Sequence, residues 1–276
     1  MSLQIASLNS GSNGNCYYIG NDTDAIFVDV GLSCRETERR MQRLNLSMQK
    51  IKAIFISHEH IDHVRGLAGI ATKYNLPIYV THKTKAGCYH LTDHNTIHFN
   101  ANEPVNIGTL SIVGFSKLHD AADAHSFNIT SNGITVGVFT DIGTVCDNLI
   151  HHFKQCHAAF LEANYDDEML ENGRYPVFLK DRIRGTHGHL SNEQALKLFE
   201  NHRPKFMTQL LLAHLSKDNN SVQLVQDLFS VIDRNVEVVV ASRYGESLVY
   251  SIGEINNNNT LVNKTEGKVF YQATLF

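Results

Sequence analysis

Short apolar runs, separated by polar segments, dominate the pattern of hydrophobic and polar positions along this chain. Such runs, where they are rich in β-branched and aromatic side chains, predict buried strands. They occupy residues 3–9, 17–19, 26–30, 53–56, 78–81, 110–115, 127–131, 134–140, 158–161, 206–212 and 236–241. The last run is largely apolar, so we predict that it forms a central strand of its sheet.

Helical signals lie between these runs. Apolar residues recur at helical spacing in residues 64–74, which predicts a helix. Serine N-caps predict further helices, some with the acidic or amide partner of a capping box: Ser33 with Glu36, for a helix that ends near Leu44, Ser191 with Gln194, and Ser221, for a helix that runs to Arg234. The pair Asn132-Gly133 between two strands predicts a hairpin with a type I′ turn.

The order of these elements predicts the fold class. Strands and helices alternate with hairpins, and no long parallel series is present, so an α/β layered sandwich with mixed sheets fits best. We find no repeat and no linker, and therefore expect one domain over residues 1–276. Residues 254–276 would be a C-terminal extension, in which 269–276 could add an edge strand.

The stretch His58-Glu59-His60-Ile61-Asp62-His63 directly follows the apolar run 53–56 and packs imidazoles and a carboxylate closely together. Neutral imidazole nitrogen and carboxylate oxygen are ligands that borderline divalent metals such as Zn²⁺ prefer. His58 and His60 are two residues apart and cannot share a helix face, so we place them at a strand exit. The stretch predicts a metal-binding loop; the alternative is a polar surface loop in a chain with 16 histidines.

Further histidines and carboxylates stand at the ends of predicted strands. They are Asp29, His119, Asp141, Glu162 and His214. Their common position favours one shared site. Asp29 interrupts an apolar run, where a carboxylate is costly unless it has a partner. It would either orient a metal-binding histidine or cap nearby N–H groups, and the sequence leaves both interpretations open.

Two other segments have features of a phosphate-binding surface. The loop from Ser10 to Asn15 contains two glycines, and its backbone N–H groups could face a phosphate or simply turn a hairpin. Residues 165–186 are predicted to be irregular. They contain basic and aromatic side chains that suit contacts with phosphates and bases, although an ordinary solvated loop would look similar: Arg174, Tyr175, Lys180, Arg182 and Arg184.

His189 stands just before the helix that Ser191 opens. Backbone donors and the positive end of the helix dipole favour an anion at such a place. A histidine there can also give a proton to a leaving oxygen. The other histidines between strands have no ligand-like spacing and are predicted to lie on the surface: His82, His90, His94 and His98.

Composition narrows the class of protein. A chain of 276 residues with 42% hydrophobic and 19% charged residues suits a globular protein with a full core. No apolar run approaches the length of about 20 residues that spans a bilayer, and no secretory signal is evident. Five cysteines without a CxxC pair predict reduced thiols and a cytoplasmic location. Because the net charge is −4, nucleic acid would have to bind at a local basic patch.

Taken together, these motifs resemble the metallo-β-lactamase superfamily, and within it the YycJ/WalJ branch of bacterial proteins similar to a double-strand DNA 5′ to 3′ exonuclease. The resemblance implies a four-layer αββα sandwich with a metal centre at one edge. It is carried by the motifs at residues 10–15, 58–63, 119–123, 140–143, 161–164, 188–192 and 213–220.

The resemblance also implies roles for individual residues. His58, His60 and His119 would hold one divalent ion, Asp62, His63 and His214 a second, with Asp141 between them; zinc is the metal most expected, and manganese or iron the alternatives. The pair formed by Glu162 and His189 looks like the one with which tRNase Z protonates its leaving group. Asp62, Glu162 and His189 would thus be catalytic, and Asn15 and Ser191, with the basic residues of 174–184, would contact phosphate.

The implied activity is sequence-tolerant hydrolysis of a phosphodiester in nucleic acid, DNA rather than RNA, by a water that two metal ions activate. Only 47 residues separate Asp141 from His189, too few for the extra domain of β-CASP nucleases. An RNA-processing nuclease and a thioesterase of the glyoxalase II type remain as alternatives, and a non-catalytic, metal-stabilised binding module is the least favoured. Oligomeric state is left open.

Overall fold

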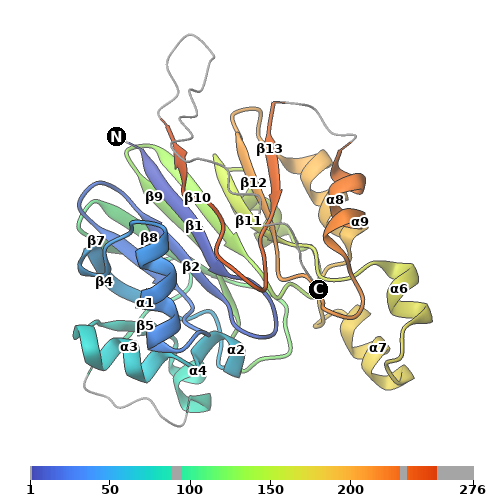
Figure 1. Ribbon diagram of the computed structural model, residues 1–276, viewed down its shortest axis with the longest axis horizontal. Coiled ribbons are helices and arrows are strands. Elements are labelled where there is room, and N and C mark those ends of the chain that lie inside the picture. Colours follow the sequence, from blue (N-terminus) through green and yellow to red (C-terminus); the bar gives the residue numbers. More distant parts are fainter. Residues whose placement is uncertain (1, 89–94, 231–234, 254–276) are drawn as a thin grey trace.

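Two seven-stranded sheets pack face to face in the computed structural model, which describes residues 2–88, 95–230 and 235–253 (Figure 1). The first, here called the N-terminal sheet, has the order β14-β1-β2-β3-β4-β5-β6. Its strands are β1 (Leu3–Asn9), β2 (Cys16–Gly20), β3 (Ala25–Val28), β4 (Ile51–Phe55), β5 (Ile78–Val80), β6 (Thr96–His98) and β14 (Tyr250–Ile252).

The second, here called the C-terminal sheet, has the order β13-β12-β11-β10-β9-β8-β7. Its strands are β7 (Pro104–Ile107), β8 (Leu110–Ser116), β9 (His125–Ser131), β10 (Ile134–Phe139), β11 (Ala158–Glu162), β12 (Gln209–Ala213) and β13 (Glu237–Val240). Each sheet is antiparallel in one half and parallel in the other, the parallel strands being β3 to β6 and β10 to β13. Both sheets are therefore mixed, as predicted.

Helices cover the outer face of each sheet (Figure 1). Apolar residues of α1 and α3 pack on the N-terminal sheet, and those of α5, α8 and α9 pack on the C-terminal sheet. The bounds are α1 (Cys34–Arg43), α2 (Ile61–Val64), α3 (Leu67–Tyr74), α4 (His82–Gly87), α5 (Asp147–Phe153), α6 (Asp167–Asn172), α7 (Val177–Arg184), α8 (Asn192–His202) and α9 (Val222–Phe229), with a 3₁₀ helix η1 at Met48–Lys50. The αββα sandwich expected from the sequence is confirmed.

The apolar runs of the sequence fill the space between these layers. Phe55, Phe127 and Phe160 are buried between the two sheets, and every residue of β10 is buried. Strands covered on both faces are apolar throughout rather than alternating, which is why they appear in the sequence as continuous runs. Each large apolar side chain that is fully buried contributes about 1.5–3 kcal/mol.

The predictions for the Asn132-Gly133 hairpin and for His82 and His98 are confirmed. β9 and β10 form the expected hairpin, and Asn132 and Gly133 have φ values of 49° and 78°, as a type I′ turn requires. His82 and His98 are exposed and stack on each other with ring centroids 3.5 Å apart. The five cysteines are free. No helix in the described ranges combines the length and the apolar character needed to cross a membrane.

Other predictions are wrong. Residues 165–186 are not irregular but contain α6 and α7, which lie off the sandwich at the lower right of Figure 1. β13 is the last strand of its sheet in the described part of the chain, not a central one. Only half of the first capping box forms, because the Ser33 hydroxyl accepts from the Glu36 N–H while the Glu36 carboxylate accepts from Arg39 and Arg40. Residues 269–276, His90 and His94 lie outside the described residues.

Candidate metal centre and active site

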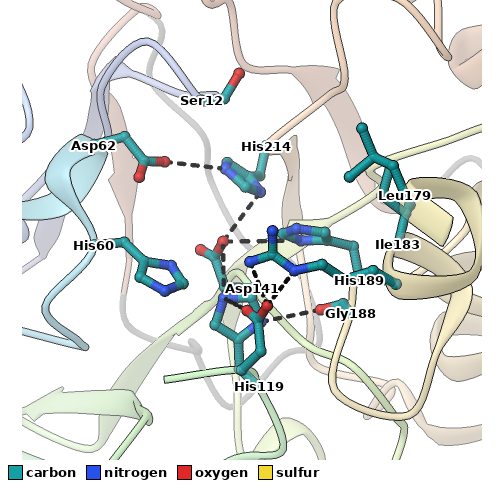
Figure 2. Close-up of a pocket in the computed structure, with 12 residues that line it drawn as sticks. Ser12, His60, Asp62, His119, Asp141, Leu179, Ile183, Gly188, His189 and His214 are labelled. Atoms are coloured by element: carbon teal, nitrogen blue, oxygen red, sulfur yellow. Dashed lines mark hydrogen bonds and ion pairs between the residues drawn. The ribbon is translucent and has the colours of Figure 1, made fainter. Parts of the chain in front are cut away.

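A pocket of about 200 Å³ opens where the carboxyl ends of the parallel strands meet (Figure 2). The segments that follow β4, β8, β10 and β12 supply half of its lining residues, and α7 closes one side. Its lining residues are Ser12, His60, Asp62, His119, Asp120, Asp141, Leu179, Arg182, Ile183, Gly188, His189 and His214. Residues far apart in the sequence thus converge on one cavity.

Four groups of side chains around this pocket could each hold a metal ion, because their ligand atoms lie within 4.8 Å of one another. Together they contain all seven residues that the sequence proposed as metal ligands. The groups are His58, His60 and His119; Asp62, His63 and His214; His58, His63 and Asp141; and Asp141, Glu162, His189 and His214. Asp141 belongs to two of them, which suits a ligand placed between two ions.

The electron-pair donors in these groups fit divalent cations. His119 Nε2 and His214 Nε2 are buried, and neither makes a hydrogen bond with a described residue. His119 Nε2 lies 3.3 Å from a carboxylate oxygen of Asp120, and His214 Nε2 lies 3.7 Å from one of Asp62. Since buried polar atoms without a partner are costly, imidazole nitrogens that face carboxylates in this way form a donor set that a cation would satisfy.

Asp29 supports the metal loop from the N-terminal sheet. β3 ends at Val28, so the carboxylate stands at the strand exit, where it is fully buried. It accepts hydrogen bonds from the Ser57 N–H at 2.9 Å and the Ser57 hydroxyl at 2.7 Å, and His63 Nδ1 lies 2.7 Å from it. A bond at Nδ1 leaves His63 Nε2 for a ligand. The structure therefore shows both interpretations of Asp29: the carboxylate orients His63, and it also accepts from the nearby Ser57 N–H.

The metal loop itself is held close to β3 by a glycine. A Cβ atom on Gly31 would lie 1.7 Å from the backbone oxygen of Asp62, so no larger residue fits there. The buried Asn15 amide lies 3.1 Å from Asp62 Oδ2 and 3.0 Å from His63 Nε2. The side chain of Asn15 thus positions two candidate ligands, and its placement does not support the predicted contact with substrate phosphate.

Glu162, at the end of β11, supports the site from the C-terminal sheet. It is fully buried, and its Oε2 accepts from the N–H groups of Ile142 at 2.7 Å and Leu190 at 3.1 Å. Its Oε1 lies 2.8 Å from His189 Nδ1 and 2.9 Å from His214 Nδ1. Burial opposes its ionisation, but His189 and His214 outweigh burial and lower the pKa of Glu162 to about 2. The link to His189 follows the prediction, whereas the link to His214 was missed.

Three residues at the strand exits have left-handed backbone conformations. Asp29, Asp141 and His214 have φ values of 59°, 54° and 58°. This region is unfavourable for residues other than glycine, and such strain concentrates at functional sites. Nothing in the sequence indicated these conformations, since aspartate and histidine also occur in ordinary loops.

Two histidines have pKa values that favour the neutral, metal-binding form. Burial holds the pKa of His58 well below its usual value and lowers the pKa of His119 to about 4. The Nδ1 atom of His119 lies 3.0 Å from the Gly188 carbonyl oxygen, so this nitrogen carries the proton and Nε2 offers its lone pair to the pocket.

Two others are surrounded by carboxylates. Burial disfavours the protonated forms of His63 and His214, but Asp141 and its acidic neighbours outweigh burial. They raise the pKa of His63 well above its usual value and that of His214 to about 10. The same interactions hold the pKa of Asp141 well below its usual range, against the effect of burial. Without a metal, these two imidazolium groups offset the negative charge of the site.

The predicted phosphate-binding residues divide into two sets. Arg182 lines the pocket, and its guanidinium Nε donates to Asp120 Oδ2 at 2.6 Å. The other candidates do not line it. Arg184 pairs with Asp181 and Glu171, Lys180 donates to the Glu171 carbonyl, and Arg174 is exposed. Ser191 is buried and accepts from the Gln194 N–H as a helix cap. The apolar residues of α7 that face the pocket, Leu179 and Ile183, were not foreseen.

Comparison with known proteins gives a consistent result. A family model described as the beta-lactamase superfamily domain matches residues 24–214. The exodeoxyribonuclease YycJ of Bacillus anthracis is 36% identical over 231 residues, which cover 82% of this chain and 87% of that protein. The exodeoxyribonuclease WalJ of Streptococcus pneumoniae is 30% identical over 228 residues, covering 80% and 85%.

Among solved structures, the metallo-β-lactamase fold protein YhfI of Bacillus subtilis superposes with a TM-score of 0.70. The match covers 91% of this chain and 100% of that chain, at 18% identity, and at this identity it supports the fold alone. The sequence matches and the sandwich together establish that the chain is a hydrolase of the metallo-β-lactamase superfamily, in its YycJ/WalJ-like branch.

Proposed function

We propose that this protein is a metal-dependent phosphodiesterase that shortens double-stranded DNA from the 5′ end. The observation that carries the proposal is the convergence of seven candidate metal ligands on a pocket that His189 also lines. The names of its relatives YycJ and WalJ, both exodeoxyribonucleases, support nucleic acid as the substrate and DNA over RNA.

We assign His58, His60 and His119 to one divalent ion and Asp62, His63 and His214 to a second, with Asp141 shared. The mainly imidazole donor set favours zinc, with manganese or iron as alternatives. When bound, two such ions would lower the pKa of an attacking water and offset the charge that builds up on the phosphate.

His189 is the proposed proton donor. Its side chain is 22% exposed and lines the pocket, while its Nδ1 lies 2.8 Å from the Glu162 carboxylate. Because that bond orients the ring, Nε2 is the nitrogen left to give a proton to the departing sugar oxygen. Glu162, whose pKa is lowered to about 2, stays ionised at neutral pH and can accept the hydrogen bond from His189 Nδ1 before and after the proton leaves Nε2.

The pocket is suited to the sugar-phosphate backbone rather than to base edges. Its polar lining consists mainly of candidate ligands, His189 and the Arg182–Asp120 pair. Direct readout of sequence needs side chains that hydrogen-bond to base edges, so we expect cleavage that tolerates any sequence.

Incubation of 5′-end-labelled duplex DNA with the protein and Mn²⁺ or Zn²⁺ tests the proposal. We expect progressive release of nucleotides from the labelled end, and loss of that release in Asp62→Ala, because Asp62 is both a candidate ligand and a lining residue. Hydrolysis of a thioester or of RNA without any action on DNA would favour the rival functions. Stable binding of DNA without shortening, under every metal tried, would indicate a binding module instead.

A further inference from the structure

A second cavity of about 200 Å³ adjoins the active-site pocket. It lies between the loop that follows β12 and the loop that follows β13, and its lining residues are Leu215, Ser216, Lys217, Asn220, Ser221, Val222, Ala241, Ser242, Arg243 and Tyr244. His214 lines the first pocket and Leu215, the next residue, lines the second. The two cavities therefore share a wall. We call the second one the 217–244 cavity.

Arg243 connects the two cavities. One guanidinium nitrogen, Nη1, donates to the Leu215 carbonyl and the other, Nη2, to the Ser12 hydroxyl, each at 3.3 Å. Ser12 itself lines the active-site pocket. A guanidinium has five N–H donors, so these two bonds fix its place and leave other donors for a ligand.

The charge of this cavity differs from that of the whole molecule. Its charged lining residues are Lys217 and Arg243, and none of the described residues that line it carries a carboxylate. Lys217 is exposed and makes no ion pair with any residue in the described ranges. The neighbouring Asp218 carboxylate accepts a hydrogen bond from Tyr175. In a chain with a net charge of −4, this is a local site that favours an anion.

Tyr244 supplies an aromatic surface beside these cations. It is 75% exposed, and the Arg243 guanidinium lies 5.9 Å from the centre of its ring. The cavity has apolar walls from Leu215, Val222 and Ala241. Aromatic rings next to cationic side chains are the usual means of holding a base and its phosphate without regard to sequence.

We propose that the 217–244 cavity is a nucleotide subsite, which holds the nucleotide next to the bond being cleaved. Tyr244 stacks on its base, while Lys217 and Arg243 contact its phosphate. This inference rests on the proposed function, because a strand bound at the metal centre continues across the shared wall. Part of the substrate affinity then comes from residues that are not involved in the chemistry.

Binding can be measured apart from cleavage with a fluorescent duplex oligonucleotide whose 5′-terminal linkages are phosphorothioates, added to the metal-loaded protein. We expect Tyr244→Ala and Lys217→Glu each to weaken binding at least about fivefold, as loss of one stacked base or one phosphate contact does. Tyr244→Phe should bind like the wild type. Lys217→Ala should also reduce the slope of the logarithm of the binding constant against the logarithm of salt concentration by about one. A purely structural role would not produce this change.

Lys205→Glu is the matched control, because Lys205 is exposed and precedes β12, at the opposite end of that strand from His214. It makes the same change in charge and should leave affinity unchanged. Photo-crosslinking with 5-iododeoxyuridine placed near the 5′ end should label Tyr244 in the wild type. Both Lys217 and Tyr244 are exposed, so we expect their variants to melt at the same temperature as the wild type.

The outcomes separate this inference from the proposed function. If the wild type cleaves DNA and all variants bind equally, the subsite is wrong and the nuclease assignment stands. If the wild type binds the duplex, loses affinity in both variants and cleaves no nucleic acid, the 217–244 cavity is a nucleotide-binding site, but the nuclease assignment fails and with it the place of that site beside a cleaved bond. If the wild type neither binds nor cleaves, both are overturned.

Discussion

Two buried carboxylates, each at the end of a strand and one from each half of the sandwich, stand behind the candidate metal centre. Asp29 follows β3 and Glu162 ends β11; both are fully buried and both accept hydrogen bonds from backbone N–H groups. Asp29 lies against one imidazole, that of His63, whereas Oε1 of Glu162 lies within 3 Å of two, those of His189 and His214.

This difference indicates that the two sides of the centre have different tasks. The side-chain hydrogen bonds of Asp29 lead only to His63 in the metal loop and to Ser57 directly before it, so its effect should be confined to metal binding. Glu162 orients one candidate ligand and the proposed proton donor with the same oxygen atom. We therefore infer that metal binding and proton transfer are coupled on the C-terminal side and not on the N-terminal side.

The broadest effect, on turnover and on metal content together, is expected for Glu162→Gln. The amide has one acceptor in place of two and cannot satisfy the four donors around it, so His189 and His214 should both lose their orientation. Turnover of duplex DNA should fall about 10²–10⁴-fold, together with metal content measured by mass spectrometry. Glu193→Gln, at an exposed position, is the control. Normal turnover in Glu162→Gln would remove the coupling we infer.

His189→Ala separates proton donation from metal binding. We expect a loss of about 10²–10⁴-fold on DNA, with metal content unchanged. On bis(4-nitrophenyl) phosphate, whose leaving group departs without a proton, the loss should be below about tenfold, since only the proton donor has been removed. An equal loss on both substrates would contradict its role as an acid and indicate that His189 positions the substrate.

Asp29→Asn should lower metal affinity and leave the proton donor His189 unaffected. Loss of the partner that orients His63 is expected to lower metal affinity about 10–100-fold, as measured by competition with a chelator. Activity should return when Zn²⁺ or Mn²⁺ is added in excess, because the proton donor is intact. Activity that stays low at saturating metal would show that the two carboxylates do the same task.

His63 on the N-terminal side and His214 on the C-terminal side should make metal affinity depend on pH in the same way. In the metal-free protein the pKa of His63 is raised and that of His214 is about 10, so both are protonated at pH 7 and must lose these protons on binding a metal. Metal affinity should therefore fall as pH falls, by about tenfold per pH unit for each displaced proton. His119, with a pKa of about 4, should release none.

Calorimetric titration of metal into the chelator-treated protein, in buffers with different ionisation enthalpies, gives the number of protons released. Two protons at pH 7 are expected, one from each side of the centre. Release of none would mean that the histidines beside Asp29 and Glu162 are already neutral.

Much of the fold could be predicted from local patterns. Buried strands of a four-layer sandwich are apolar on both faces, and the Asn132-Gly133 turn has a chemical signature. The helices α6 and α7 were missed although signals were present: the Asp166 side chain accepts from the Met169 N–H as an N-cap, and Pro176 directly precedes α7. The edge position of β13 had no signal, because strand order depends on the path of the whole chain.

The residues of the candidate site likewise divide into those that the sequence predicts and those whose placement it does not predict. The metal loop could be recognised because His58, His60, Asp62 and His63 are close in sequence, and Asp141 and His214 because polar groups at strand exits are conspicuous. The inward placement of Asn15 and Ser191 could not be predicted from the sequence, because amide and hydroxyl side chains are equally common in loops that face solvent. Arg182 could be distinguished from Arg184 only by the direction of its side chain in α7.

The sequence by itself therefore determined which chemical groups are available, imidazoles and carboxylates at the ends of apolar strands, because their residue types and local spacing carry that information. Only the tertiary structure decided which of them face one another. The packing of the two sheets brings Asp29 and Glu162 behind one pocket, and the pairing of β12 with β13 gathers Lys217, Arg243 and Tyr244 around a second cavity. Such contacts are set by the close packing of segments distant in the chain, which no local pattern of residues encodes.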